Sequence, residues 1–285
     1  MRFRNYLYVS VVMFAAMTAT WFAARSSAER VLPDVNNDYQ IGATLWMQKA
    51  GEYRALAYQA FNIAQLRLDA DLDKKNIKKL PKAERKKPRA IMVDIDETML
   101  DNSPAQAFGI INHRPFNNDD WYAWGRLKKA KPIPGAVDFV NYAVSKGVKV
   151  FFVSNRDEVQ KPETIENLVL AKFADISAEN VLLRQRDANG RSISTKEPRR
   201  EFILEKYRIV MFIGDNLDDL ADVFEKRTVE DRFAEVNKAR ALFGGRYIVL
   251  PNAMYGTWES ALYSYDNSLA AEDKEKRRAA ALELP

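Results

Sequence analysis

The 285-residue sequence contains no cysteine and a single histidine, His113. A cysteine nucleophile, a disulfide and a thiolate metal site are therefore excluded. A metal centre built from several histidines is excluded as well, and a Ser-His-Asp triad would depend on His113. The sequence also lacks a glycine-rich phosphate loop of the GxxxxGKS or GxxxxGKT type. The nucleophile classes that remain are carboxylate, hydroxyl and lysine.

The basic excess of the chain is small and lies partly at its start. The formal net charge is +5, and all acidic residues follow Ala28, whereas Arg2, Arg4 and Arg25 precede it. Without these three arginines, the 44 basic and 39 acidic residues would leave a net charge of +2. A hydrophobic content of 47% with 29% charged residues is typical of a globular protein. We therefore expect a folded domain, and no nucleic acid among its partners.

Residues 1–28 have the pattern of a secretory signal peptide. Two arginines give a positive start, an apolar run follows, and the small residues at 26–28 suit a signal peptidase. Cleavage would leave Glu29 as the first residue of an exported protein. Residues 6–24 are nearly long enough to cross a bilayer, so an uncleaved membrane anchor is the alternative.

Three further segments flank the central part of the chain. Residues 29–73 are predicted to be helical, because apolar residues recur at three- and four-residue steps from Trp46 to Leu68. Residues 74–88 form a basic connector, for which we expect a solvated loop; binding to anionic lipid or nucleic acid is the alternative. Residues 266–285 are predicted to form a polar tail, solvated or in a frayed helix.

The most informative stretch is residues 89–102, where an apolar run ends in two acids, Asp94 and Asp96. A short apolar run of this kind predicts a buried strand with polar residues at its carboxyl end. In open α/β sheets that end is where ligands bind. Residues two apart in a strand project to the same side, and two crowded carboxylates repel each other. The pattern therefore favours a cation between them.

A second stretch, residues 209–220, repeats this arrangement. Its apolar run is followed by Asp215, Asp218 and Asp219. Two buried strands that both end in acids can bring four carboxylates to one edge of a sheet. Such a set of oxygen ligands suits Mg²⁺.

The segments DIDETMLDN and FIGDNLDD together resemble the two motifs of the class C, or DDDD, acid phosphatases of the haloacid dehalogenase superfamily. The likeness extends from about residue 38 to residue 258, in the order expected of bacterial members. Those members include lipoproteins that act as periplasmic or outer-membrane 5′-nucleotidases. They attach through a cysteine after the signal, which this chain lacks. The resemblance therefore implies a periplasmic or secreted enzyme without a lipid anchor.

The repeated order of strands and helices predicts an α/β fold with a parallel sheet flanked by helices. The resemblance implies the haloacid-dehalogenase form of that fold, as a phosphatase domain over residues 89–265. Residues 103–131 are rich in aromatic side chains and are expected to form a small cap beside the site. The helical residues 29–73 would then be an N-terminal extension.

For the chemistry, the resemblance implies a phosphoric monoester hydrolase in which Asp94 is the nucleophile and forms an aspartyl-phosphate. Asp96 would protonate the leaving alkoxide and then take a proton from the hydrolytic water. Mg²⁺ would be bound by Asp94, by the main-chain carbonyl of Asp96 and by Asp215. Asp219 would be a further ligand, directly or through water.

The phosphoryl oxygens need positive or hydrogen-bonding partners. Ser154 follows the next predicted strand, where the superfamily has a Ser or Thr that contacts phosphate, and Asn155 comes directly after it. The family also has a lysine just before or within a later helix. Lys196 fits that position best, and Arg199 and Arg200 are close rivals that the spacing does not separate.

Two aromatic residues carry the expectation about the substrate. In nucleotidase members of the family, aromatic residues at the positions matching Trp121 and Tyr255 stack on the two faces of the base. The implied substrate is therefore a nucleoside monophosphate. A sugar phosphatase or a phosphatase of broad specificity is the alternative within the same chemistry.

A non-catalytic binding protein on the same fold, for example one that binds haem, is the alternative of a different class. Plant relatives of the non-catalytic type have lost the nucleophile. This chain keeps Asp94, Asp96, Asp215 and Asp219, which favours an enzyme. The sequence predicts no oligomeric state.

Overall fold

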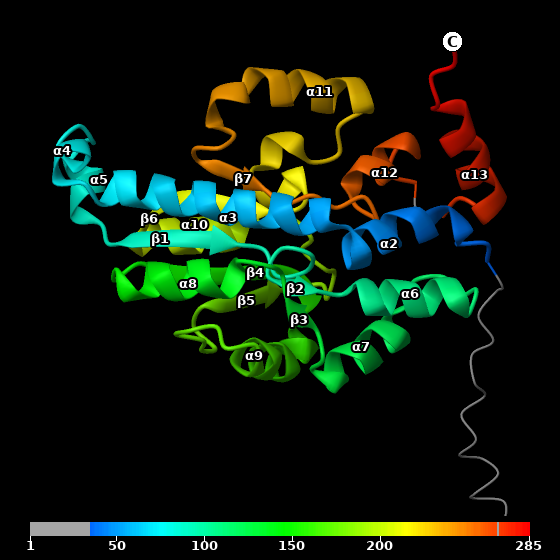
Figure 1. Ribbon diagram of the computed structural model, residues 1–285, viewed down its shortest axis with the longest axis horizontal. Coiled ribbons are helices and arrows are strands. Elements are labelled where there is room, and N and C mark those ends of the chain that lie inside the picture. The colour runs from blue at the N-terminus through cyan, green and yellow to red at the C-terminus, as the bar shows by residue number, and fades with distance from the viewer. Residues whose placement is uncertain (1–34, 267) are drawn as a thin grey trace, which may run out of the picture. The chain divides into compact units, whose positions relative to one another are not determined.

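The computed structural model describes residues 35–285, except residue 267. A five-stranded sheet in the order β5-β4-β1-β6-β7 lies at its centre, and every neighbouring pair is parallel (Figure 1). The strands are β1 (Arg89–Val93), β4 (Lys149–Asp157), β5 (Val181–Arg184), β6 (Arg208–Gly214) and β7 (Tyr247–Val249). The predicted α/β fold with a parallel sheet flanked by helices is confirmed.

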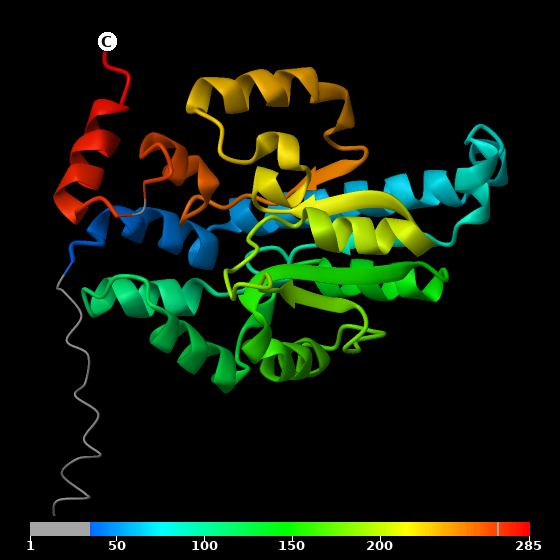
Figure 2. The same cartoon turned by 180° about the vertical axis from the view of Figure 1, so that it is seen from behind.

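Side chains of β1 alternate between two apolar layers. Ile91 and Val93 belong to the layer that includes helices α3 (Gly51–Leu72), α8 (Ala136–Ser145) and α9 (Lys161–Leu170). Ala90 and Met92 face the other layer, which is covered by α10 (Glu197–Lys206). Figure 2 shows α10 on the face turned away in Figure 1. Burial on both faces explains why these strands are almost wholly apolar up to their carboxyl ends.

Two α-helices form most of the described part of the N-terminal segment. The single periodic pattern of the sequence is divided at Ala50, whose backbone is extended, between α2 (Ile41–Lys49) and α3. Trp46 and Tyr53 pack edge to face across this break, with ring centroids 5.6 Å apart. At the far end of α3, Asp71 binds Arg89 and Arg208, which ties the helix to the starts of β1 and β6.

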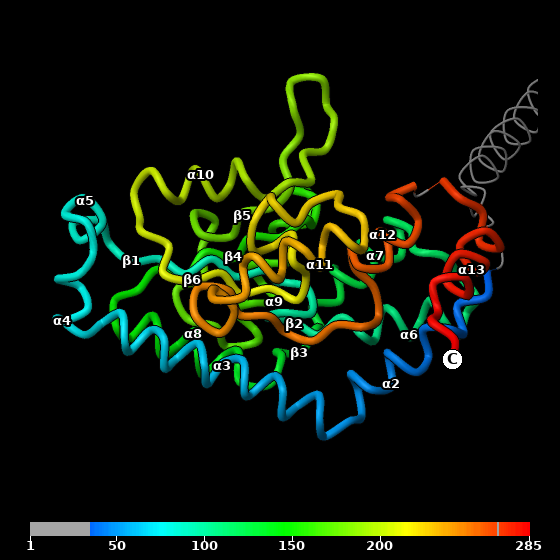
Figure 3. Tube along the Cα trace, turned by 90° about the horizontal axis from the view of Figure 1, so that it is seen from above, coloured from blue at the N-terminus to red at the C-terminus, as the bar shows by residue number. Residues whose placement is uncertain are grey.

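The segment predicted to be a cap, residues 103–131, and the basic connector lie at opposite ends of the strands. Helices α6 (Ser103–Ile111) and α7 (Asn118–Leu127) lie beyond the carboxyl ends, where a two-stranded ribbon of β2 (Leu100–Asp101) and β3 (Lys131–Pro132) leads into and out of them. The basic connector contains two short exposed helices, α4 (Lys74–Ile77) and α5 (Lys82–Lys86), where the sequence predicts a loop. Figure 3 shows α4 and α5 at the end opposite α6 and α7.

The remaining helices follow the sheet or connect its strands. They are α11 (Val229–Lys238), α12 (Thr257–Leu262), α13 (Ala271–Ala280), and the 3₁₀ helices η1 (Asp38–Gln40), η2 (Glu158–Gln160), η3 (Leu217–Asp219), η4 (Asp222–Phe224) and η5 (Arg240–Leu242). The predicted polar tail thus contains α13, and its Arg278 packs on the ring of Tyr39.

The predicted signal peptide, residues 1–28, lies outside the described residues. Among the helices that the structure describes, none combines the length and the apolar character needed to cross a membrane.

Candidate active site

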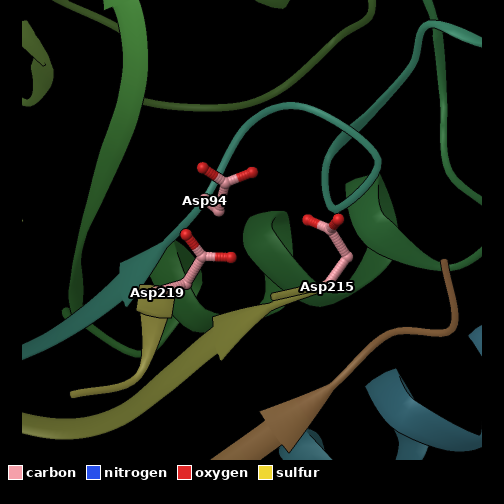
Figure 4. A group of neighbouring side chains, drawn as sticks. All are labelled: Asp94, Asp215 and Asp219. Atoms are coloured by element: carbon pink, nitrogen blue, oxygen red, sulfur yellow. The ribbon is translucent and has the colours of Figure 1, made fainter. Parts of the chain in front are cut away.

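Three carboxylates meet at the carboxyl edge of the sheet. Asp94 follows β1, Asp215 follows β6, and Asp219 lies in the adjoining 3₁₀ helix η3. Each offers one oxygen atom, and these atoms lie within 4.8 Å of one another (Figure 4). A set of three hard oxygen donors this close could hold a metal ion.

A glycine allows Asp219 to reach this position. A Cβ atom placed on Gly214, the last residue of β6, would lie 2.5 Å from the Cβ of Asp219 and 2.6 Å from its Oδ2. The Asp219 Oδ2 atom accepts a hydrogen bond from the Asn216 amide at 3.0 Å, while Asn216 caps η3 in return. The GDNLDD sequence therefore folds the chain back so that Asp219 sits directly over the end of its own strand.

Lys196 supplies the positive charge beside these acids. Lys196 is 97% buried, and its ammonium group lies 2.7 Å from Asp219 Oδ1 and also donates to Asp94 Oδ1. The two rival arginines point elsewhere. Arg199 donates to the carbonyl of Ser154 at 2.6 Å, and Arg200 pairs with Glu197 and covers the ring of Phe212. Lys196 is thus the one of the three that the structure places against the acids.

Burial disfavours the negatively charged forms of Asp94 and Asp215. Burial raises the pKa of Asp215 to about 7, and the charge of Asp219 adds to this effect. Burial also raises the pKa of Asp94 well above its usual range; the Lys196 ammonium opposes this rise and the other acids reinforce it. Crowded buried carboxylates of this kind are stabilised by a cation between them, so the donor set fits a divalent metal ion.

Two polar residues outside the predicted set hold Asp215. Thr98 donates to Asp215 Oδ1 and Asn252 donates to Oδ2, both at 2.9 Å. Thr98 belongs to the DIDETMLDN motif, and Asn252 lies just beyond β7. The rule that strand ends carry the site could have found both residues.

The side chain of Asp96 is not part of the three-carboxylate cluster and has partners of its own. Its Oδ1 accepts hydrogen bonds from Arg156 Nη2 at 2.8 Å and from Asn102 Nδ2 at 2.9 Å, and Ser154 Oγ donates to its Oδ2 at 2.9 Å. This arrangement is compatible with the expectation that only the main-chain carbonyl of Asp96 serves a metal. Arg156, which is 97% buried, is a partner that the sequence analysis left without a role.

The two phosphate-contacting residues expected near the end of β4, Ser154 and Asn155, both form hydrogen bonds within the protein. Ser154 is buried, donates to Asp96 and accepts from the Arg156 amide at 3.0 Å. Asn155 is exposed, and its Oδ1 accepts from Arg199 Nη2 at 2.7 Å. Arg199 therefore fixes the segment that carries both residues.

The two aromatic residues expected to hold a base come from different parts of the fold. Trp121 is half-buried on α7, where Arg156 lies 5.4 Å from the centre of its ring and Phe116 packs at 6.2 Å. Tyr255 is half-buried in the loop after β7 and packs on the main core. The same loop contacts the acids, because Asn252 donates a hydrogen bond to Asp215.

Comparison with known proteins identifies the family. The family model for "HAD superfamily, subfamily IIIB (Acid phosphatase)" matches residues 8–258. The chain belongs to this acid phosphatase family. The resemblance noted in the two aspartate motifs is therefore confirmed, and so is the prediction of a phosphomonoesterase at the level of the family.

Solved structures of this family share the fold over most of the chain. The class C acid phosphatase from Bacillus anthracis is 38% identical, with a TM-score of 0.79 over 87% of this chain and 98% of that one. A second structure of the Bacillus enzyme, with tungstate bound, matches equally well. Acid phosphatase 1 of Solanum lycopersicum is 30% identical over 129 residues, which are 45% of this chain. The match spans half the length of the tomato protein.

Proposed function

We propose that this acid phosphatase family member is a Mg²⁺-dependent phosphomonoesterase that forms an aspartyl-phosphate on Asp94 and acts on 5′-nucleotides. The observation that carries the proposal is the position of Asp94. It follows β1, lies beside Asp215 and Asp219, and accepts a hydrogen bond from the buried Lys196. The tungstate bound to the Bacillus relative supports an oxyanion site, because tungstate has the tetrahedral shape of phosphate.

Mg²⁺ would be held by Asp94, Asp215 and the main-chain carbonyl of Asp96, with Asp219 as a further ligand, directly or through water. When bound, it would neutralise charge on the nucleophile and on the phosphoryl group. Lys196 adds a fixed positive charge at the same place, between Asp94 and Asp219. Positioning and charge neutralisation provide most of the catalysis in phosphoryl transfer.

In the first step, a carboxylate oxygen of Asp94 attacks phosphorus, and the bond from phosphorus to the ester oxygen breaks. A proton moves from Asp96 to the departing alkoxide. In the second step, water attacks the aspartyl-phosphate and gives a proton to Asp96, so that phosphate leaves and both acids return to their starting state. Ser154 and Asn155, which border the site from β4, are the proposed further contacts of the phosphoryl oxygens.

The preference for nucleotides depends on Trp121 and Tyr255, as the two faces of a base site. Both rings are half-buried, so each keeps a surface on which a base could stack. A phosphatase for sugar phosphates or for many esters remains the alternative, since it would use the same acids without these rings. A haem-binding role has weaker support: His113, the one histidine, lies in the turn after α6.

We also propose that the protein is exported, to the periplasm or beyond, with its signal cleaved before Glu29. Mass spectrometry of the exported protein should find Glu29 as the first residue. An intact Met1 in the membrane fraction would instead identify residues 6–24 as an anchor.

Phosphate release by the purified protein tests the proposed activity. The substrates are adenosine 5′-monophosphate, a sugar phosphate and an aryl phosphate, each at mildly acidic pH with Mg²⁺ or with EDTA. We expect metal-dependent release that is fastest with the nucleotide. Equal rates on all three substrates would retain the aspartate mechanism and refute the base site. No release from any of them by the folded protein would refute the activity.

A further inference from the structure

We propose that Asn102 and Trp124 are positioning residues that orient the proton donor Asp96 from the cap. This inference rests on the proposed function, because it assigns Asp96 the transfer of a proton to the leaving oxygen. Asn102 is 98% buried and lies between the two groups. Its Nδ2 donates to Asp96 Oδ1 at 2.9 Å, and its Oδ1 accepts from Trp124 Nε1 at 2.8 Å.

The chemistry of the indole decides which way the Asn102 amide points. A tryptophan Nε1 can only donate, so it requires the carbonyl oxygen of the amide. The amide nitrogen is then directed towards Asp96, whose Oδ1 accepts its hydrogen bond. Arg156 Nη2 lies 3.3 Å from the same Asn102 oxygen and favours the same orientation. Without Trp124, only the two longer contacts of 3.3 Å, from Arg156 Nη2 to the amide oxygen and from the amide nitrogen to the Leu100 carbonyl, would hold the amide in this orientation beside its bond to Asp96.

The effect on Asp96 is to distinguish its two oxygens. Oδ1 receives N–H donors from Asn102 and from two nitrogens of Arg156, at 2.8–3.0 Å. Oδ2 has the Ser154 hydroxyl at 2.9 Å and a longer contact of 3.3 Å from Arg156 Nε. A hydroxyl can rotate to accept instead of donate, whereas N–H groups cannot. Oδ2 is therefore the oxygen that can carry the proton and pass it to the leaving group.

This arrangement gives the cap a part in the reaction. Trp124 lies on α7, the helix that also bears Trp121, and Tyr122 of the same helix donates to Asp157 at the end of β4. Arg156 also links α7 to Asp96, because it contacts both Asp96 and the ring of Trp121. The helix proposed to bind the base is thus linked to the proton donor through the side chain of Asn102.

The leaving group provides the test. Ribose alkoxide needs a proton as it departs, whereas nitrophenolate leaves as a stable anion. Trp124→Phe keeps an aromatic ring and removes the donor, so kcat/KM on adenosine 5′-monophosphate should fall about fivefold, the factor that one hydrogen bond is worth. Asn102→Leu should lower it about tenfold or more, within the roughly 10²–10⁴-fold that general acid catalysis contributes. On nitrophenyl phosphate, both variants should keep kcat/KM within about twofold of the wild type. The ratio kcat/KM is compared because it does not include the hydrolysis of the aspartyl-phosphate, in which Asp96 acts with either substrate.

Trp46→Phe is the matched control. Trp46 is half-buried against Tyr53, and its indole nitrogen makes no hydrogen bond to the residues that the structure describes. Its kcat/KM on both substrates should equal that of the wild type. Equal losses of kcat/KM on both esters in folded Trp124→Phe, or no loss on either, would overturn the inference while the wild-type activity stands. An inactive wild type would overturn the proposed function, and the inference with it.

Discussion

Gly214→Ala should raise the Mg²⁺ requirement of the enzyme, because the added methyl group would lie where Asp219 is. The new Cβ would be 2.5 Å from the Cβ of Asp219, well inside van der Waals contact. Overpacking of this kind costs about 1–3 kcal/mol. The strain is relieved if Asp219 withdraws from Asp94 and Asp215. The metal affinity then falls by the same free energy, which is about 5- to 150-fold in the half-saturating Mg²⁺ concentration.

The assay is phosphate release as a function of Mg²⁺ concentration, with thermal unfolding measured in parallel. Gly51→Ala is the control, because a Cβ on Gly51, the first residue of α3, meets nothing within 4 Å. That variant should keep the wild-type Mg²⁺ requirement. A folded Gly214→Ala protein with an unchanged requirement would refute the claim that Asp219 must lie over the end of β6.

Three further substitutions test other parts of the account. Asp94→Asn should abolish nearly all turnover in a protein that keeps the wild-type circular dichroism; substantial remaining activity would sink the nucleophile assignment. Lys196→Met should lower kcat by about 10²–10³-fold. Arg200→Met should leave kcat unchanged, since Arg200 pairs with Glu197. Equal effects of the two substitutions would argue against Lys196 as the phosphate-binding cation. Burial would raise the pKa of Asp71, but hydrogen bonds from Arg208 and Arg89 outweigh it and hold that pKa below its usual value. The stabilisation by Asp71 is therefore complete above the unfolded-state pKa, and is lost as the pH falls through the lower folded-state value. In urea unfolding at neutral pH, Asp71→Asn should lower the free energy of unfolding by about 3 kcal/mol. Glu235→Gln, in an ion pair on the surface, should lower it by less than about 0.5 kcal/mol. An unfolding midpoint of Asp71→Asn equal to that of the wild type would contradict this role of Asp71.

Several features of the site could be predicted because each depends on a pattern local in sequence. Asp94 and Asp215 follow apolar runs, and parallel strands bring their carboxyl ends to one edge. The two-helix N-terminal segment was harder, because its apolar period continues through Ala50. Only the extended backbone at that residue divides the helices, and Gly51, with its low helix propensity, is the single local sign.

Other features depend on contacts that no local pattern encodes. Lys196, Arg199 and Arg200 lie within five residues, and only the approach of α10 to the sheet decides which one meets the acids. The link from Trp124 to Asn102 joins residues 22 apart in the sequence. It arises because the β2–β3 ribbon returns the chain to the site after α7, and neither apolar periodicity nor motif spacing reports such a return.

The most direct test of the central claim is to trap the phosphorylated enzyme. The protein is mixed with adenosine 5′-monophosphate and Mg²⁺, quenched in acid during turnover, digested, and analysed by mass spectrometry. We predict an acid-stable phosphoryl group on the peptide that contains Asp94, sensitive to hydroxylamine and absent from Asp94→Asn. Turnover with no phosphorylated peptide, or with the phosphoryl group on a residue other than Asp94, would contradict the proposed mechanism.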